Sequence, residues 1–290
     1  MALIRLHKLL AGWGVASRRA VEAMILARRI RVDGEVFTDL GRRVDPAACR
    51  IEIDGRPVTP PAANVSVVMV FHKPAGVLSS LGDRFGRPTL ADFFPGPERL
   101  YPVGRLDSDS TGLLLMTNDG ELTNRLLHPR YKVEKEYLVQ VAGPPLTAAE
   151  RARFEHGLDL EDGRTAPCHL RPILRKGAAD SPTASPWVRR ASPQVPSRDR
   201  QARQKRTDAS LPRAAALCPP TITYRVILRE GRKRQIKRMF AALDRRVVAL
   251  HRIRFGPIRL GDLPPGRARP LSAEERRALL AAIGREETER

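Results

Sequence analysis

Two carboxylates and a threonine stand just ahead of an apolar segment in the middle of the chain. Residues 104–120 read GRLDSDSTGLLLMTNDG, with Asp107 and Asp109 shortly before the apolar run Leu113 to Met116. The whole chain carries 52 Lys and Arg against 32 Asp and Glu, a formal net charge of +20. A carboxylate at such a place can serve as a nucleophile or as a ligand for a cation. The spacing therefore raises the question of which role Asp107 has in so basic a protein.

A calcium loop is one alternative for this stretch. Gly112 falls at the sixth position, where such a loop needs a glycine, but the twelfth position holds Asn118 instead of a bidentate acid. The oxygen shell would be incomplete, which excludes the calcium reading.

A second alternative is the DxDxT nucleophile motif of haloacid-dehalogenase-type phosphatases, which Asp107, Asp109 and Thr111 fit. That motif needs a buried strand running directly into the first Asp, and here Pro102, Gly104 and Arg105 interrupt it. The region after residue 130 also lacks a paired-acid motif for Mg²⁺. An aspartyl phosphatase therefore stays an alternative with little support.

The third alternative takes in the whole stretch and three other segments. GRLDSDSTGLLLMTNDG closely resembles the catalytic motif of rRNA pseudouridine synthases of the RsuA/RluB type. HKPAG (72–76), EKEYLV (134–139) and EGRKRQIKRMFAAL (230–243) resemble the family's other motifs, in the family's order. The resemblance spans the chain except for residues 175–217, and it implies an enzyme that isomerises a specific uridine in ribosomal RNA.

The resemblance also implies roles for individual residues. Asp107 is the expected catalytic carboxylate, Tyr137 the active-site tyrosine, and Lys237 the cation that keeps Asp107 ionised. A lysine at this last position excludes the bidentate contact of an arginine. The reaction is an isomerisation, so we expect no cofactor and no metal. Asp109 and Asp119 are interpreted as turn or cap residues.

Basic residues around these motifs are candidates for RNA contact. The base must leave its stack before Asp107 can reach the sugar, and Arg105 could fill the space or hold a flanking phosphate. Each of the other basic residues near the motifs either contacts a backbone phosphate or is an ordinary charge on the surface. The predicted phosphate contacts are Lys73, Arg232, Lys233, Arg234 and Arg238.

The elements in front of the catalytic motifs predict a small N-terminal module over residues 1–60. Helical spacing of Leu6, Leu9, Leu10 and Trp13 gives one helix, and Ser17 caps a second. Asp33-Gly34 between apolar runs predicts a hairpin. The pattern resembles the S4-type RNA-binding domain, which implies RNA contacts from exposed basic residues. These are Lys8, Arg18, Arg19 and Arg31.

Residues 65–290 predict a catalytic domain of strands and helices. Apolar runs predict strands over VSVVMVF, LLLMT, EKEYLVQVAG, TITYRVIL and ALHRIRFGPIRL. Capping boxes begin helices at Thr147, whose helix is predicted over TAAERARFEHGLDL, and at Ser272. RQIKRMFAAL adds another helix. Together with the resemblance, this predicts an α+β fold: a mixed, largely antiparallel sheet flanked by helices, behind the S4-type domain.

Residues 175–217 break this rhythm, because they are rich in proline and basic residues and nearly devoid of apolar ones. We predict a disordered basic insertion within the catalytic domain. Residues 60–64, PPAAN, are predicted to be a linker.

Bulk properties narrow the partner and the compartment. A sequence pI near 11.1 favours a polyanionic partner, and nucleic acid is the usual one. Three scattered cysteines fit a reducing cytoplasm, and the sequence contains no apolar run of the ~20 residues that a membrane helix needs. We expect a cytoplasmic monomer that binds ribosomal RNA, free or in an assembling subunit. A non-catalytic RNA-binding or ribosome-assembly protein is the alternative from another functional class.

Overall fold

A computed structural model describes residues 3–60, 66–96, 99–173 and 221–284. The chain divides into two compact units, the first formed mainly by Met1–Val67 and the second by most of the remaining residues. The predicted insertion at 175–217 and most of the predicted linker at 60–64 lie outside the described residues. Within the described ranges, no helix is both long and apolar enough to cross a membrane.

Two short helices and two hairpins build the first unit. Helices α1 (Leu6–Gly12) and α2 (Arg18–Leu26) pack together, and the Ser17 side chain accepts a hydrogen bond from Ala20 N at 3.1 Å, which confirms the predicted cap. Leu6, Leu10 and their neighbours on both helices share one core with the strands that follow.

Both Asp-Gly pairs of this unit form the turns of hairpins. Asp33 and Gly34 have φ of 53° and 85°, and Asp54 and Gly55 have φ of 51° and 75°, as a type I′ turn requires. The sheet order is β3-β2-β5-β6, with a separate β1–β4 pair. The strands are β1 (Ile4–Arg5), β2 (Ile30–Val32), β3 (Glu35–Val36), β4 (Arg43–Val44), β5 (Ile51–Ile53) and β6 (Arg56–Val58).

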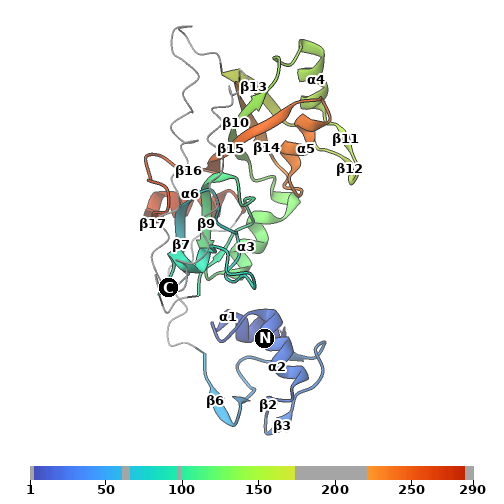
Figure 1. Ribbon diagram of the computed structural model, residues 1–290. Helices are drawn as coiled ribbons and strands as arrows, with labels where there is room; N and C mark the ends of the chain where they lie inside the picture. Colours follow the sequence, from blue (N-terminus) through green and yellow to red (C-terminus); the bar gives the residue numbers. More distant parts are fainter. Residues whose placement is uncertain (1–2, 61–65, 97–98, 174–220, 285–290) are drawn as a thin grey trace, which may run out of the picture. The chain divides into compact units, whose positions relative to one another are not determined.

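A nine-stranded sheet forms the frame of the second unit, in the order β13-β14-β10-β15-β9-β7-β17, with β16 beside β15 and β8 beside β9 (Figure 1). Most of its pairs are antiparallel, but β15 and β9 are parallel. The strands are β7 (Val68–Lys73), β8 (Tyr101–Pro102), β9 (Thr111–Thr117), β10 (Lys135–Ala142), β13 (His169–Ile173), β14 (Thr221–Leu228), β15 (Arg246–Phe255), β16 (Ile258–Arg259) and β17 (Ala268–Pro270). This confirms the predicted α+β class with a mixed, largely antiparallel sheet.

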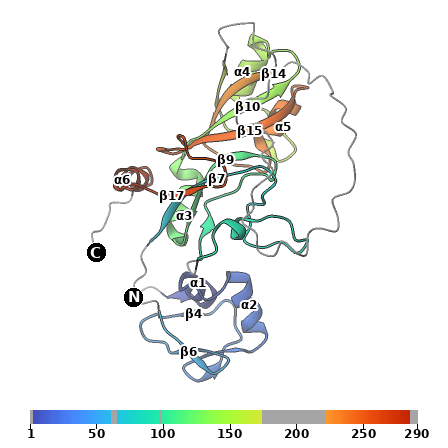
Figure 2. The same cartoon turned by 60° about the vertical axis from the view of Figure 1, so that its left-hand side comes forward.

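Helices cover this sheet in two groups. Figures 1 and 2 show α4 (Ala148–His156) and α5 (Gln235–Ala241) beside β14, and α3 (Gly120–Leu127) near β7 and β9. Helix α6 (Ala273–Ala281) shares a hydrophobic core with β7 and β9. In the first group the Phe240 ring lies 4.8 Å from Phe154 and 5.5 Å from Tyr224, measured between centroids. Short 3-10 helices, η1 (Leu90–Phe93) and η2 (Pro129–Tyr131), occupy two of the loops.

The helix predicted over residues 147–160 is shorter than expected. Its capping box is present at Thr147 and Glu150, but the helix ends at His156 because Gly157 has φ of 99°. A Cβ on Gly157 would lie 2.3 Å from Thr165 O, so the chain turns tightly here. Asp159–Leu160 is instead β11, which forms a hairpin with β12 (Gly163–Arg164).

Candidate active site

Asp107 stands in the loop of residues 104–110, between β8 and β9, and we call this segment the Asp107 loop. Ser79 Oγ donates to Leu106 O at 2.7 Å and accepts from Leu106 N at 3.1 Å. On the other side of Asp107, Gly76 N donates to Ser108 O at 2.7 Å. The segment that follows β7 therefore fixes the backbone on both sides of the carboxylate.

Lys73 is a buried brace of the Asp107 loop. Its exposed fraction is 0%, and its Nζ donates to the carbonyl oxygens of Pro74 at 3.0 Å, Ser108 at 3.3 Å and Ser110 at 2.9 Å. Burial lowers the pKa of Lys73 to about 7, while three carbonyl acceptors match the three N–H groups of an ammonium ion. The predicted phosphate contact of Lys73 is therefore contradicted, because the side chain is enclosed by protein.

Gly112 lets the catalytic motif approach the neighbouring strand. A Cβ at this position would lie 2.2 Å from Arg252 O and 2.6 Å from Arg252 N, and Gly112 has φ of 105°. Here β9 and β15 pair in parallel, with Gly112 opposite Arg252 and Thr111 opposite His251. The glycine of the motif is thus explained by backbone packing.

Lys237 links the Asp107 loop to α5. Its Nζ lies 3.6 Å from Asp107 Oδ2 and donates to Asp109 Oδ1 at 2.5 Å. Side-chain exposure is 13% for Lys237, 34% for Asp107 and 66% for Asp109. The structure therefore brings the predicted cation to the predicted carboxylate, and it adds Asp109 as a second partner that the sequence had assigned to a turn.

Asp109 remains ionised in this arrangement. Partial burial works to raise its pKa, but the hydrogen bond and charge of Lys237 more than reverse this and hold the pKa below its ordinary value. Lys237 is thus shared between two carboxylates, and only one of them, Asp107, lines the pocket described next.

A pocket of about 580 Å³ opens beside Asp107. Its lining includes the Asp107 loop, Tyr137 on β10, Arg252 on β15 and the residues that lead into α5. Tyr137 is 8% exposed, and no side-chain or backbone partner for its hydroxyl occurs among the described residues. The pocket thus combines a carboxylate, an aromatic ring and several cations.

A β-bulge directs Tyr137 toward this pocket. The register between β10 and β15 shifts between Glu136 and Tyr137, and such irregularities re-aim a side chain. The Arg252 guanidinium lies 5.9 Å from the centre of the Tyr137 ring and donates from Nε to Leu113 O at 2.7 Å. Arg252 therefore lies against the Tyr137 ring while it joins β15 to β9.

Two buried cations line the same pocket as Tyr137, and the sequence analysis did not single them out. Lys135 is 8% exposed and Arg252 is 2% exposed, and both lie over the Phe255 ring. Burial, followed by the charge of Arg252, lowers the pKa of Lys135 to about 8. Lys135 shares a strand face with Tyr137, two residues on, so an inward lysine in the alternating pattern was the available signal.

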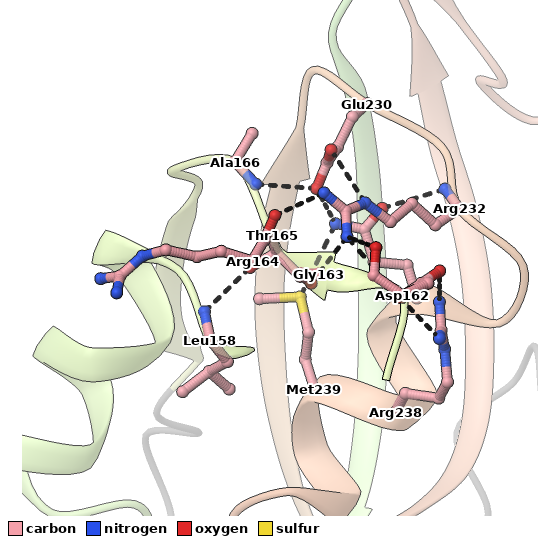
Figure 3. Close-up of polar contacts among 11 residues, drawn as sticks. Leu158, Asp162, Gly163, Arg164, Thr165, Ala166, Glu230, Arg232, Arg238 and Met239 are labelled. Carbon is pink, nitrogen blue, oxygen red and sulfur yellow. Dashed lines mark hydrogen bonds and ion pairs between the residues drawn. The ribbon is translucent and has the colours of Figure 1, made fainter. Parts of the chain in front are cut away.

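Arg232 and Arg238 are engaged with the β11–β12 hairpin (Figure 3). Arg232 donates from Nη1 to Gly163 O at 2.8 Å and from Nη2 to Arg164 O. Arg238 makes a bidentate pair with Asp162, both bonds being 2.9 Å. These contacts differ from the predicted phosphate contacts, because both guanidinium groups already have protein partners.

Glu230 organises the turn into α5, and the sequence analysis did not single it out. Its Oε1 accepts from Ala166 N at 2.9 Å and from Gln235 Nε2 at 2.5 Å, and its Oε2 accepts from Arg232 Nε at 3.3 Å. The same turn sets Arg234 in a left-handed conformation with φ of 52° just before the helix. Glu230 thereby fixes the start of α5, and Lys237 is the third residue of that helix.

The remaining predicted contacts are exposed. Arg105, Lys233 and Arg234 line the pocket, and their side chains have no hydrogen-bond or ion-pair partner among the described residues. On the first unit the four predicted RNA contacts are also exposed: Lys8, Arg18, Arg19 and Arg31. All of these side chains are available for an anionic ligand.

Residues 67–242 match a family model described as RNA pseudouridylate synthase, and residues 4–48 match one described as S4 domain. The chain belongs to the RNA pseudouridylate synthase family. Its relatives include an uncharacterized RNA pseudouridine synthase of Aquifex aeolicus, 36% identical over 98% of this chain and 96% of that protein. They also include ribosomal large subunit pseudouridine synthase B of Bacillus subtilis, 35% identical over 96% of each.

Among solved structures, a crystal structure of a pseudouridylate synthase shares 26% sequence identity with a TM-score of 0.57, covering 95% of this chain and 99% of that one. The protein is therefore an RNA pseudouridine synthase with an N-terminal S4 domain, and it isomerises uridine in RNA. The family assignment leaves no support for the aspartyl phosphatase alternative.

The buried position of Lys73 makes a prediction for the synthase. Lys73→Met should lower turnover because the Asp107 loop loses its brace, while RNA affinity and its dependence on salt stay unchanged. Lys233→Met, which removes an exposed lysine at the pocket, should instead lower the slope of log K against log salt by about 0.7. Salt titrations of RNA binding and turnover assays on both variants make the comparison. A smaller salt slope for Lys73→Met than for wild type would show instead that Lys73 contacts a phosphate.

Two buried histidines beside the Asp107 loop predict a loss of stability in mild acid. Burial, followed by the charge of His72, lowers the pKa of His251 to about 4, and burial lowers that of His72 as well. A depressed pKa means that stability is present above the unfolded pKa of ~6.5 and is lost as pH falls toward the folded value. From pH 7 to pH 5, His251 should remove about 2 kcal/mol.

The check is the urea midpoint of wild type and of His251→Gln at pH 7 and pH 5. We expect a smaller acid-induced drop in the variant than in wild type. His169→Gln removes an exposed histidine and serves as the matched control. Equal drops in all three proteins would show that His251 is not the group responsible.

Proposed function

We propose that this synthase converts a specific uridine of large-subunit ribosomal RNA to pseudouridine, with Asp107 as the catalytic carboxylate. The observation that carries the proposal is the ion pair between Lys237 Nζ and Asp107 Oδ2 at 3.6 Å, at a pocket that Tyr137 also lines. A cation at this distance can stabilise the negative charge that nucleophilic or electrostatic catalysis requires at this carboxylate.

The reaction breaks the bond between the ribose and nitrogen 1 of uracil, turns the base, and joins it again through carbon 5. The proton on carbon 5 is lost and one is gained at nitrogen 1, so the atoms balance without any co-reactant. Asp107 acts either by attacking the sugar or the ring or by supporting the charge that develops as the bond breaks. In each case the uridine must first leave its stack and enter the pocket.

Tyr137 is suited to hold the base inside the pocket. Its ring is fixed by the β10 bulge and by Arg252, and its hydroxyl is free of protein partners within the described chain. The ring can stack on the uracil, and the hydroxyl can move a proton at the base. A rigid support of this kind keeps the base close to Asp107 during its rotation.

Exposed cations around the pocket are suited to the RNA backbone. Arg105 precedes Asp107 by two residues and can fill the space that the uridine leaves or hold a flanking phosphate. Lys233 and Arg234 line the same pocket from the segment that leads into α5. The pocket therefore offers exposed cations from two separate segments of the chain.

The choice of ribosomal RNA rests on the relatives and on charge. The Bacillus subtilis relative is named for the large ribosomal subunit. The S4 domain adds the exposed cations Lys8, Arg18, Arg19 and Arg31 to a chain of net charge +20. A folded basic module can recognise an RNA shape as well as attract phosphates. A pure ribosome-assembly role is disfavoured, because a binder has no need of the Asp107, Tyr137 and Lys237 arrangement.

Incubation of the protein with transcripts of large- and small-subunit rRNA, followed by carbodiimide-stop sequencing, tests this function. We expect a new stop at one uridine of the large-subunit transcript. A stop in the small-subunit transcript alone would reassign the substrate. Absence of any stop, in free RNA and in isolated ribosomal particles alike, would overturn the proposed function.

A further inference from the structure

An exposed aromatic ring stands on a loop that the proposed mechanism does not use. Phe85 is 67% exposed, in the loop of residues 81–87, which we call the Phe85 loop. No other large apolar side chain among residues 66–96 is exposed to a comparable degree. A single exposed phenylalanine without an apolar surround is unlike a protein-docking patch, which gathers several such side chains.

The Phe85 loop is held in one shape by Asp83. The Asp83 carboxylate accepts from Phe85 N at 3.0 Å and Arg87 N at 3.1 Å. It also accepts two bonds from the Arg87 side chain, at 3.1 Å from Nε and 2.7 Å from Nη2. The ring is therefore presented to solvent by an ordered loop. Binding of a ligand then costs little conformational entropy in the loop.

Two guanidinium groups lie against the Phe85 ring, and only one of them is held by a carboxylate. Arg84 lies 4.7 Å and Arg87 5.3 Å from the ring centre. Arg87 is fixed by Asp83, whereas Arg84 has no carboxylate partner within the part of the chain that the structure describes. Arg84 can thus move aside for a ligand while Arg87 keeps the ring in place.

The stem of the Phe85 loop is bonded to the Asp107 loop. Leu78 N donates to Pro88 O and Leu90 N to Ser80 O, each at 2.9 Å, which closes the stem. Within the stem, Ser79 exchanges two hydrogen bonds with Leu106, the residue before Asp107. The Phe85 loop is therefore joined through its stem to the segment that carries Asp107.

We propose that Phe85 is a stacking platform for an unpaired base of the substrate RNA, and that Arg84 binds a phosphate beside that base. Every nucleobase has a flat face that stacks on an aromatic ring, and arginine adds charge attraction. Bases within a double helix are stacked on each other and cannot use such a platform. The loop thus selects a uridine in a loop or bulge over one in a helix. The proposal rests on the proposed function only for the reaction that follows binding.

Binding measurements in the Asp107→Asn background test the platform separately from turnover. The probes are a hairpin RNA with a ten-nucleotide single-stranded loop and a fully paired duplex of the same length. Phe85→Ala and Phe85→Leu should each weaken binding to the hairpin about tenfold or more, and leave duplex binding unchanged. Phe85→Trp should retain affinity, and its fluorescence should be quenched by the stacked base. Val248→Ala removes another exposed apolar side chain and is the matched control.

The salt dependence separates the two residues. Arg84→Ala should lower the slope of log K against log salt by about 0.7 for single-stranded RNA, whereas Phe85→Ala should leave the slope unchanged. Equal hairpin affinities for Phe85→Ala and wild type, or full affinity in Phe85→Leu, would overturn the stacking platform. A binding defect of the Phe85 variants on ribosomal particles but not on free hairpin RNA would also overturn it, because the ring would then contact a ribosomal protein. A catalytically dispensable Asp107 would refute the proposed function and leave these binding results standing.

Discussion

Replacement of Asp107 by Asn is expected to lower turnover by on the order of 10⁴-fold or more, while RNA affinity is largely retained. The substitution keeps the shape and the hydrogen-bonding capacity of the side chain, but it removes the negative charge that can attack or support the reacting centre. The backbone bonds from Ser79 and Gly76 do not involve the carboxylate, so the loop should keep its form. Release of tritium from RNA labelled at carbon 5 of uridine measures turnover directly.

Asp109→Asn is the matched control for this experiment. Asp109 also pairs with Lys237, but it is 66% exposed and does not line the pocket. We expect this variant to keep most of its activity. If Asp109→Asn lost activity and Asp107→Asn kept it, the catalytic assignment would move to Asp109.

Lys237→Met is expected to lower kcat/KM by about 10²-fold, the usual cost of removing one group that stabilises charge in an active site. Among the described residues the lysine is the cation that forms an ion pair with Asp107, and with 13% exposure it is shielded from solvent, so its charge is weakly screened. Its loss leaves two neighbouring carboxylates without their shared partner. Single-turnover rates at saturating protein separate this effect from RNA binding.

Lys237→Arg restores the charge and serves as the control. We expect it to recover much of the lost activity, with a remaining deficit because the wider guanidinium cannot occupy the same position between Asp107 and Asp109. Activity of Lys237→Met equal to that of wild type would show that the ion pair is structural and has no part in turnover.

The convergence of Asp107, Tyr137 and Lys237 could be predicted from the sequence because the order of four motifs carries the resemblance. Sequence signals for helix starts were equally informative, because they depend only on neighbouring residues. The capping boxes at Thr147 and Ser272 begin helices as predicted, since each depends on residues three positions apart. Short-range geometry of this kind does not depend on the rest of the fold.

Residues whose roles depend on distant partners were not predictable in the same way. Lys73 looks like a surface cation in the sequence, and only the packing of β7 beside the Asp107 loop shows that its ammonium group is enclosed. Arg232 and Arg238 take partners from the β11–β12 hairpin, some 70 residues away in sequence, and the first strand of that hairpin lies where the end of a helix was predicted. No periodicity or spacing reports such a contact.

Carbodiimide-stop sequencing of rRNA from a strain that lacks this gene, restored with the wild-type or the Asp107→Asn coding sequence, tests the central claim most directly. We predict that wild type restores a stop at one uridine of large-subunit rRNA and that Asp107→Asn, produced at the same level, does not. Restoration of the stop by Asp107→Asn would contradict the account, because the uridine would then be isomerised without the carboxylate assigned to it.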